Sequence, residues 1–287
     1  MTISAACQHY GITSQAYYKQ NKVALEKAAK ASAVVALVCT QRIKQPKLGT
    51  RKLYHLLKPS MNQMKIKLGR DALFSVLRGA SMLVEPKRSY HKTTHSHHHF
   101  RKHPNLLKEG VNQVSATACE QVWVGDITYI PTKNQTVYLS LITDAYSRKI
   151  VGHHVHDSLH SAQVVKAFEL AVKGRQTSQR LIHHSDRGVQ YCSGDYQAIH
   201  VANGITCSMT DGYDCYQNAL AERVNGILKQ EFLIQMPNDL EQARQMIDES
   251  IETYNSLRPH LSLQYKTPNA VHRASVIAYQ NSQKPVY

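Results

Sequence analysis

The order of strand and helix patterns after residue 122 restricts the fold more than any other feature of the sequence. Apolar β-rich segments with short turns between them predict an antiparallel meander of strands at 122–130, 137–144 and 149–155. Helical and strand spacings then alternate, which predicts helices at 161–172, 193–202, 218–232 and 239–254 and strands at 181–184 and 205–209. This βββαβαβα order indicates an α/β domain in which a mixed five-stranded sheet carries helices on both faces.

Three acidic residues lie on three of these elements. Asp126 lies within the first strand, Asp186 directly follows the strand 181–184, and Glu222 lies on the helix 218–232, with 35 residues between the last two. Asp is rare in strands, and alternation points Asp126 toward the covered face, where an unpaired carboxylate is costly. Acids at the carboxyl end of a strand lie where α/β sheets bind ligands. Together the three carboxylates suit two Mg²⁺ (or Mn²⁺) ions beside a phosphodiester.

Each acid also has an ordinary structural interpretation. Asp126 could face solvent from an edge strand, Asp186 lies in a Ser-Asp-Arg-Gly turn sequence, and Glu222 could belong to a solvated helix face. We interpret Asp144 as a turn-capping residue and Asp211 as a solvated or backbone-bonded loop residue. The conjunction of three acids in this order of elements, rather than any one of them, favours the metal site.

The helix 218–232 carries a polar stripe on one side. Asn218, Glu222, Asn225 and Lys229 are spaced so that they share that side, while apolar residues cover much of the rest. Such a stripe can simply face solvent. It equally fits an acid that binds a metal ion and a lysine that contacts a phosphate.

Positive charge is concentrated in the first third of the chain. The formal net charge is +15, and residues 1–112 hold 20 lysines and arginines against four acids, whereas residues 113–287 hold 15 against 16. This one-sided excess indicates a polyanionic partner, and nucleic acid fits better than a membrane because no basic amphipathic segment is rich in Trp or Phe. Six scattered cysteines, the short apolar runs and the N-terminal sequence predict a reducing, cytoplasmic location without a signal peptide.

The basic third is predicted to be helical. Two short helices at 3–20 joined at Gly11 have the outline of a helix-turn-helix, although any small helical hairpin looks similar. Amphipathic helices with basic outer faces are predicted at 48–59, where Pro59 should end the helix, and at 70–78. We therefore expect a basic helical region at 1–84.

A linker is predicted at 85–112, since this segment has no hydrophobic period. Its histidine cluster, His91 to His103, lacks the cysteines, carboxylates and fixed spacing of a metal site, so we interpret it as a basic connector along a nucleic-acid backbone. The catalytic core should then occupy 113–278, and a tail 279–287.

Five segments resemble the catalytic segments of a known family. They read WVGDITYIPT, YLSLITDAYSRKIVGHHV, HHSDRGVQYCS, NALAERVNGILKQEF and YNSLRPHLSLQYKTP. They are similar to bacterial transposases of the insertion-sequence-three family, specifically the product of the second reading frame, which shares an integrase core of the ribonuclease-H-like fold with retroviral integrases. The resemblance covers about residues 115–275, and GTRKLYHLLK and GRDALFSVLRGASMLV resemble the family's N-terminal region more loosely.

The resemblance implies an Asp-Asp-(35)-Glu catalytic triad at Asp126, Asp186 and Glu222, with two Mg²⁺ (or Mn²⁺) ions and Asp126 shared by both. Water would free a 3′-OH at a DNA end, and that 3′-OH would attack target DNA without a covalent enzyme intermediate. Gln217 stands where the family has Asp, which affects the start of the helix rather than the triad.

The resemblance further implies double-stranded DNA as substrate and homo-oligomers on DNA, and an upstream reading-frame product as a possible partner. Lys229 falls where the family keeps a basic residue near DNA. Candidate DNA contacts are Lys229, Asn225, Arg187, Arg51, Lys52, Arg70, Arg78, Lys87 and Arg88.

Two other functions remain open on the sequence. A non-catalytic DNA-binding relative could repress transposition or bridge DNA ends, and a ribonuclease acting on RNA–DNA hybrids would share the fold. Metal-dependent strand transfer separates both from a transposase.

Overall fold

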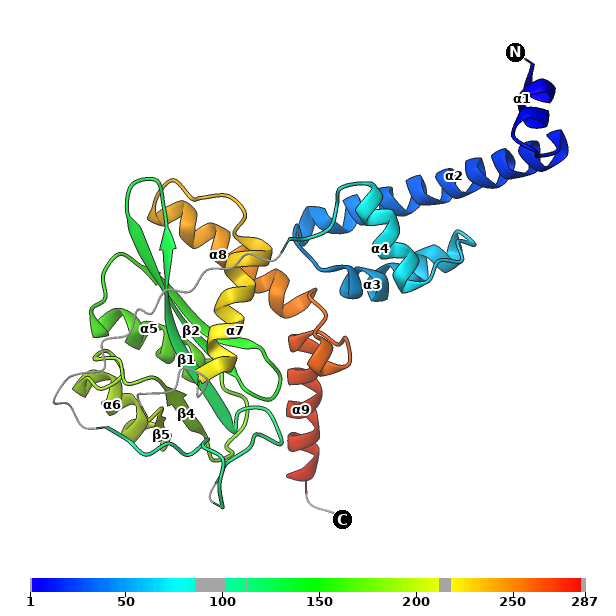
Figure 1. Cartoon of the computed structure of the whole chain (residues 1–287). Coiled ribbons are helices and arrows are strands. Elements are labelled where there is room, and N and C mark those ends of the chain that lie inside the picture. Colours follow the sequence, from blue (N-terminus) through cyan, green and yellow to red (C-terminus); the bar gives the residue numbers. More distant parts are fainter. Residues whose placement is uncertain (1, 86–101, 112, 212–217, 285–287) are drawn as a thin grey trace. The chain divides into compact units, whose positions relative to one another are not determined.

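The computed structural model describes residues 2–85, 102–111, 113–211 and 218–284 (Figure 1). By its internal contacts the chain divides into two units, Met1–Pro86 and Lys87–Tyr287. In the described residues, no helix combines the length and apolar character that crossing a bilayer requires.

The first unit is helical, as expected, but its second helix is much longer than predicted. Its elements are α1 (Ile3–His9), α2 (Ser14–Lys44), α3 (Thr50–Gln63) and α4 (Arg70–Gly79). The predicted second helix of the hairpin ended at residue 20, whereas α2 continues to Lys44. The Thr13 hydroxyl caps α2 by accepting a hydrogen bond from the Ala16 N–H at 3.1 Å.

Pro59 does not end α3, which is a correction to the sequence-based expectation. The helix runs four residues further, to Gln63, with Pro59 inside it. Proline removes one backbone donor and crowds the preceding turn. Here burial of Leu57 before Pro59 and of Met61 after it keeps both sides of the proline helical.

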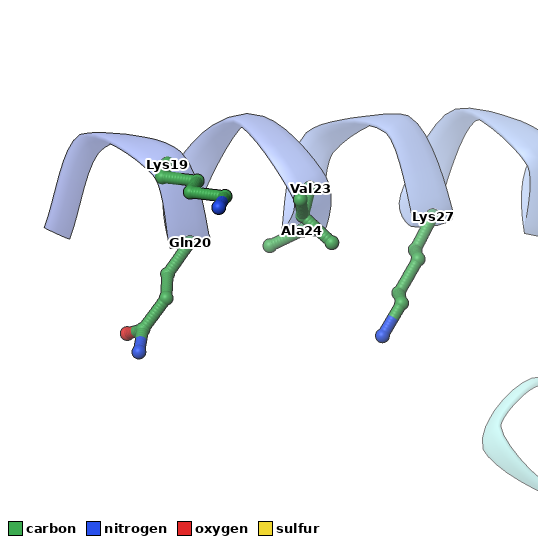
Figure 2. Close-up of a pocket in the computed structure, with 5 residues that line it drawn as sticks. All are labelled: Lys19, Gln20, Val23, Ala24 and Lys27. Carbon is green, nitrogen blue, oxygen red and sulfur yellow. The ribbon is translucent and has the colours of Figure 1, made fainter. Parts of the chain in front are cut away.

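The exposed first half of α2 carries a shallow depression (Figure 2). A single helix lines it, with Val23 and Ala24 between the basic residues Lys19 and Lys27. Since every lining residue comes from α2, the depression encloses no ligand-sized space, and we assign it no function.

The second unit contains the predicted mixed five-stranded sheet. Its strand order is β3-β2-β1-β4-β5, with β1–β2 and β2–β3 antiparallel and β1–β4 and β4–β5 parallel. The strands are β1 (Val122–Pro131), β2 (Thr136–Asp144), β3 (Ile150–His156), β4 (Ile182–Ser185) and β5 (Thr206–Met209). The predicted α/β fold class is therefore confirmed.

Helices cover both faces of the sheet, also as predicted (Figure 1). They are α5 (Ser161–Lys173), α6 (Gly194–Ala202), α7 (Ala219–Ile227), a π-helical turn (Leu228–Phe232), α8 (Leu240–Ser256), a 3₁₀ turn (Leu261–Leu263) and α9 (Pro268–Ser282). Ile130 of β1 packs in one core with α7 and α8, whereas Trp123 packs in the other with α5 and α6. Because side chains alternate along a strand, Asp126 points to the face of Ile130 and α7.

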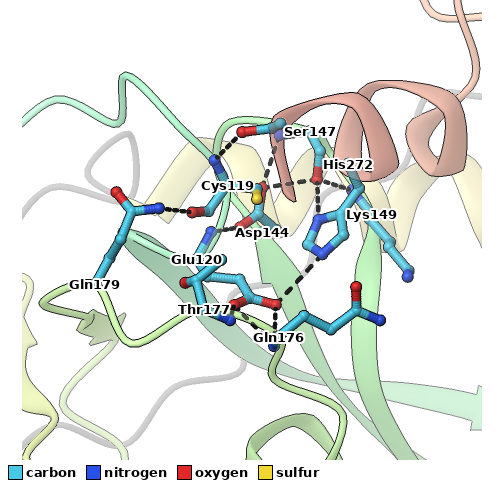
Figure 3. Close-up of polar contacts among 10 residues, drawn as sticks. Cys119, Glu120, Asp144, Ser147, Lys149, Gln176, Thr177, Gln179 and His272 are labelled. Atoms are coloured by element: carbon cyan, nitrogen blue, oxygen red, sulfur yellow. Dashed lines mark hydrogen bonds and ion pairs between the residues drawn. The ribbon is translucent and has the colours of Figure 1, made fainter. Parts of the chain in front are cut away.

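Helix α9, which the sequence did not predict, is attached to the sheet by a buried polar network (Figure 3). The Ser147 hydroxyl lies 3.0 Å from Nδ1 of His272, and Glu120 lies 3.5 Å from Nε2 of the same ring. Burial opposes ionisation of Glu120, but hydrogen bonds from His272 and two backbone N–H groups outweigh it and lower its pKa. Helix α9 continues to Ser282, so the predicted tail from 279 begins inside it.

The contacts expected from the sequence are found for Asp144 but not for Asp211. Asp144 caps the turn after β2, as expected, by accepting hydrogen bonds from the backbone N–H and hydroxyl of Ser147, both at 2.7 Å. Asp211 instead forms an ion pair with Lys108 at 2.8 Å.

The described end of the predicted linker also docks on β5, since the Leu106 N–H donates to the Ser208 hydroxyl at 2.9 Å.

Candidate active site

The parallel pairing of β1 with β4 brings two of the acids together. Val122 pairs with Ile182 and Val124 with His184, so two residues further along Asp126 and Asp186 lie at neighbouring positions. Burial raises the pKa of Asp126 to about 7, and the negative charge of Asp186 acts in the same direction. The two carboxylates therefore interact at the carboxyl end of β4.

The third acid comes from α7, which is fastened to β1 by two asparagines. The Asn218 side-chain amide donates to the Gly125 carbonyl at 3.0 Å, and the Asn225 amide donates to Oδ2 of Asp126 at 2.7 Å. Both asparagines share the helix side of Glu222, which lies between them. Burial and the charge of Asp186 raise the pKa of Glu222, so all three acids influence one another.

Asp186 is held by the turn that follows β4. Its Oδ1 accepts a hydrogen bond from the Gly188 N–H at 2.9 Å. A Cβ on Gly188 would lie 3.0 Å from that same oxygen, so glycine leaves the carboxylate room. The next turn is tied to the loop before α5, because the Gln190 amide donates to the Leu159 carbonyl at 3.0 Å.

The three carboxylates match the chemistry of Mg²⁺, which prefers oxygen ligands and is commonly held by one or two carboxylates with water. They do not converge fully. Within 2–85, 102–111, 113–211 and 218–284, no three His, Cys, Asp or Glu side chains are close enough to hold one metal ion. The donor set thus fits the ion, whereas a shared three-ligand position is not formed.

A buried aromatic and histidine layer supports β4 beneath the acids. His183 lies in contact with Phe168, whose ring centroid is 4.6 Å away, and its Nδ1 is 3.2 Å from Nε2 of His200. A Cβ on Gly125 would lie 2.8 Å from Nε2 of His183, so the residue before Asp126 must be small. The layer fixes the backbone that carries Asp126.

Acid is expected to destabilise the fold through His200. Burial lowers the pKa of His200 to about 4, against a hydrogen bond from its ring to a backbone carbonyl that opposes the shift. An unfolded histidine titrates near 6.5, so between about pH 6.5 and pH 4 only the unfolded chain gains the proton. The contribution of His200 to the free energy of unfolding should therefore fall by about 3 kcal/mol over that interval, as measured by comparing urea unfolding of wild type and a His200 variant at several pH values.

The His200→Gln variant should lose correspondingly less stability between pH 6.5 and pH 4, because its side chain does not titrate. Replacing the exposed His160 by Gln serves as the matched control and should follow the wild-type curve. Parallel curves for wild type and His200→Gln would contradict the expectation.

The predicted DNA contacts are found in several environments. Asn225 is buried and bonded to Asp126, and Arg187 lies 4.0 Å from Asp211. Lys229 is exposed beyond the end of α7. In the first unit Arg51, Arg70 and Arg78 are exposed and Lys52 is half-buried, whereas Lys87 and Arg88 lie outside the described residues.

Sequence reasoning missed the supporting residues Gly125 and His183 and the role of Asn218. Asn218 was visible in the polar stripe of the helix, but its partner is a backbone carbonyl of a strand 93 residues away in sequence. Gly125 precedes an acid inside a strand, where glycine usually indicates a close approach. That signal was available in the sequence.

Comparison with known proteins identifies the family. Residues 116–215 and 203–268 match two families that are both described as Integrase core domain. The chain is 35% identical to the insertion element IS600 uncharacterized 31 kDa protein of Shigella sonnei over 269 residues, which cover 92% of this chain and 96% of that protein. It is also 31% identical to the transposase InsF for insertion sequence IS3A of Escherichia coli over 155 residues, covering 54% of this chain and 53% of that protein.

The chain belongs to the insertion-sequence-three family of DDE-type transposases. This transposase is 38% identical to the transposase for insertion sequence element IS904 of Lactococcus lactis over 179 residues, which cover 60% of this chain and 69% of that one. Among solved structures, it is similar to the HTLV-2 integrase catalytic core domain in complex with magnesium. That match has a TM-score of 0.44 and 21% identity, and it covers 54% of this transposase and 98% of that domain.

Proposed function

We propose that this transposase cuts and joins DNA strands at the ends of a mobile element, with Asp126, Asp186 and Glu222 as its catalytic carboxylates. One observation supports the proposal: the β1–β4 pairing runs to two residues before Asp126 and Asp186, and the helix that carries Glu222 bonds to Asp126 through Asn225. The negative charge of Asp186 also contributes to the raised pKa values of Asp126 and Glu222, which supports a common site for the three acids.

The same carboxylates would hold one or two Mg²⁺ (or Mn²⁺) ions. When bound, the metal would activate the attacking oxygen and stabilise the leaving oxygen of an in-line displacement. Asn225 engages Oδ2 of Asp126, which orients the carboxylate. Burial and, second to it, the negative charge of Asp186 raise the pKa of Asp126, and a bound cation would offset both by favouring the ionised carboxylate.

The reaction proposed for these residues has two steps. In the first, water attacks a phosphodiester at the element end and the bond to the 3′ oxygen breaks, leaving a 3′-OH. In the second, that 3′-OH attacks a phosphodiester of the target and displaces another 3′ oxygen. Lys229, in the π-helical turn that follows the helix of Glu222, would offset the negative charge of the phosphate. Neither step needs a covalent enzyme intermediate.

Double-stranded DNA is the proposed partner of both units. The exposed arginines and lysines of α3 and α4 would neutralise phosphates, and several copies of the chain would assemble on the DNA ends. An upstream reading-frame product is a further proposed partner.

The proposed reaction is tested with a labelled duplex that ends in the element terminus and a supercoiled target plasmid. Joined product should form with Mg²⁺ or Mn²⁺ and should disappear with EDTA. An RNA–DNA hybrid in place of the duplex should not be cut; selective cutting of the hybrid would instead identify a ribonuclease.

A second candidate is DNA binding without catalysis. It is favoured by the observation that no three potential ligands in the described part of the chain are close enough to hold one ion. Tight binding of the duplex without any joined product, in both metals, would select this function over the first.

A further inference from the structure

A buried ion pair fastens the π-helical turn that follows α7 to the segment after α8. Arg258, 1% exposed, donates from Nε and Nη2 to the two carboxylate oxygens of Glu231, at 2.8 and 2.7 Å. Its Nη1 lies 3.0 Å from Nε2 of His260, and its guanidinium carbon lies 5.8 Å from the ring centre of Tyr254. The guanidinium group is thus fixed on every side.

Stability alone does not account for such a pair. Removing two charges from water is costly, and well-packed apolar residues of similar volume usually stabilise a fold as well or better. Glu231 lies in the π-helical turn Leu228–Phe232, which closes with a hydrogen bond from the Leu233 N–H to the Leu228 carbonyl at 3.0 Å. π-Helical turns are rare and occur frequently at functional sites.

The turn that Arg258 holds also carries Lys229, two residues before Glu231. Lys229 follows Asn225 by four residues and so lies on the same side of the helix. The side-chain amide of Asn225 is bonded to Asp126. Lys229 is exposed as a residue, but partial desolvation of its ammonium group lowers its pKa. The negative charge of Asp126 opposes that shift, so the ammonium group lies within electrostatic reach of this acid. The described contacts of Arg258 involve neither Lys229 nor any of the three acids.

We propose that Arg258 is a positioning residue: its two-pronged bond to Glu231 fixes the π-helical turn, and the turn directs Lys229 toward the phosphodiester beside Asp126. This proposal rests on the proposed function, because it assumes that DNA lies beside Asp126. Arg258 itself touches no DNA and acts only through Lys229.

The test compares three variants of the full chain with wild type. Lys229→Ala removes the cation. Glu231→Leu combined with Arg258→Met removes the ion pair but keeps apolar volume, so the fold should persist, as checked by thermal unfolding. The third variant carries all three substitutions. Affinity for the element-end duplex is measured without metal over a salt series, and strand transfer is measured with Mg²⁺.

Lys229→Ala should reduce the slope of log affinity against log salt by about 0.9, the value for one phosphate contact. The double variant should show the same reduction and a strand-transfer rate lower by about tenfold to a hundredfold, since small misplacements have effects of this size. The triple variant should show no further loss. The proposal is overturned if Lys229→Ala or the double variant keeps the wild-type slope. It is also overturned if the rate loss of the triple variant equals the product of the losses in Lys229→Ala and in the double variant.

Asn255→Ala is the matched control on α8. Asn255 is buried and bonded to the Ile150 backbone through two hydrogen bonds of 3.0 Å, so its loss should lower stability without changing the salt slope. Arg258→Lys keeps the charge but not the bidentate bond to Glu231. If the double variant does not fold, a double-mutant cycle of Arg258→Lys with Lys229→Ala takes its place as the test of the proposal. The salt slope is measured without catalysis. An inactive wild type would therefore contradict the proposed function, whereas the salt slopes would still test the role of Arg258.

Discussion

Strand transfer is expected to fall by roughly a thousandfold or more when Asp186 is replaced by Asn. The substitution keeps the shape of the side chain and an oxygen that can accept the Gly188 N–H, so the turn after β4 should persist. It removes one negative charge from the proposed metal site, where a bound ion contributes several kcal/mol and each 1.4 kcal/mol corresponds to a factor of ten in rate. Gel quantification of joined product over time measures the effect.

DNA affinity should stay at the wild-type value or rise slightly in Asp186→Asn, because a negative charge beside the phosphates is gone. Asp195→Asn is the control, since Asp195 is an exposed acid in the first turn of α6. It should retain full activity. Wild-type rates in Asp186→Asn would remove this carboxylate from the catalytic site, and the same experiment applies to Asp126→Asn and Glu222→Gln.

A large loss of stability is expected when Gly152 of β3 is replaced by Ala. The added Cβ would lie 2.2 Å from the Ala167 carbonyl oxygen and 2.8 Å from the Ala171 Cβ, both on α5. The first neighbour belongs to the helix backbone and the second is a rigid methyl group, so the helix must move away from the sheet. We expect the free energy of unfolding to fall by about 3 kcal/mol and the melting temperature by roughly 6–12 °C.

Gly194→Ala provides the comparison for that result. A Cβ at Gly194 meets no atom within 4 Å, so its melting temperature should stay within about 2 °C of wild type. Calorimetry of both variants measures the difference. Equal melting temperatures would mean that α5 is not packed on β3 as closely as described.

The sheet and its helices could be predicted because their apolar residues follow regular periods over a covered surface. Helix α2 could not, since its middle is exposed, as at Leu25, and has no apolar side that a period would reveal. Helix α9 is joined to the turn after β2 and to the residues before β1 through polar contacts of His272 and Ser275. Local helix propensity and polar contacts decide such elements, and neither gives a strong pattern.

The candidate site could be predicted as a set of residues but not as an arrangement. Asp126 was assigned correctly to the covered face because alternation in a strand is strict. Its position beside Asp186 depends on the parallel pairing of β1 and β4, which are separated in sequence by α5 and two other strands. Local sequence patterns do not determine the register of strands that lie so far apart in the chain. The roles of Asn225 and of the Arg258–Glu231 pair depend on contacts of the same long range.

The two asparagines that join α7 to β1 have a consequence for the life of the protein in the cell. Asn218 and Asn225 donate hydrogen bonds to consecutive residues of one strand, Gly125 and Asp126. Glu222 therefore takes its position near Asp126 only when α7 is docked on the sheet. In a growing or partly unfolded polypeptide the three acids would lie apart, and the proposed catalytic site would not be formed. The proposed cleavage of DNA would thus depend on the docking of α7 against β1.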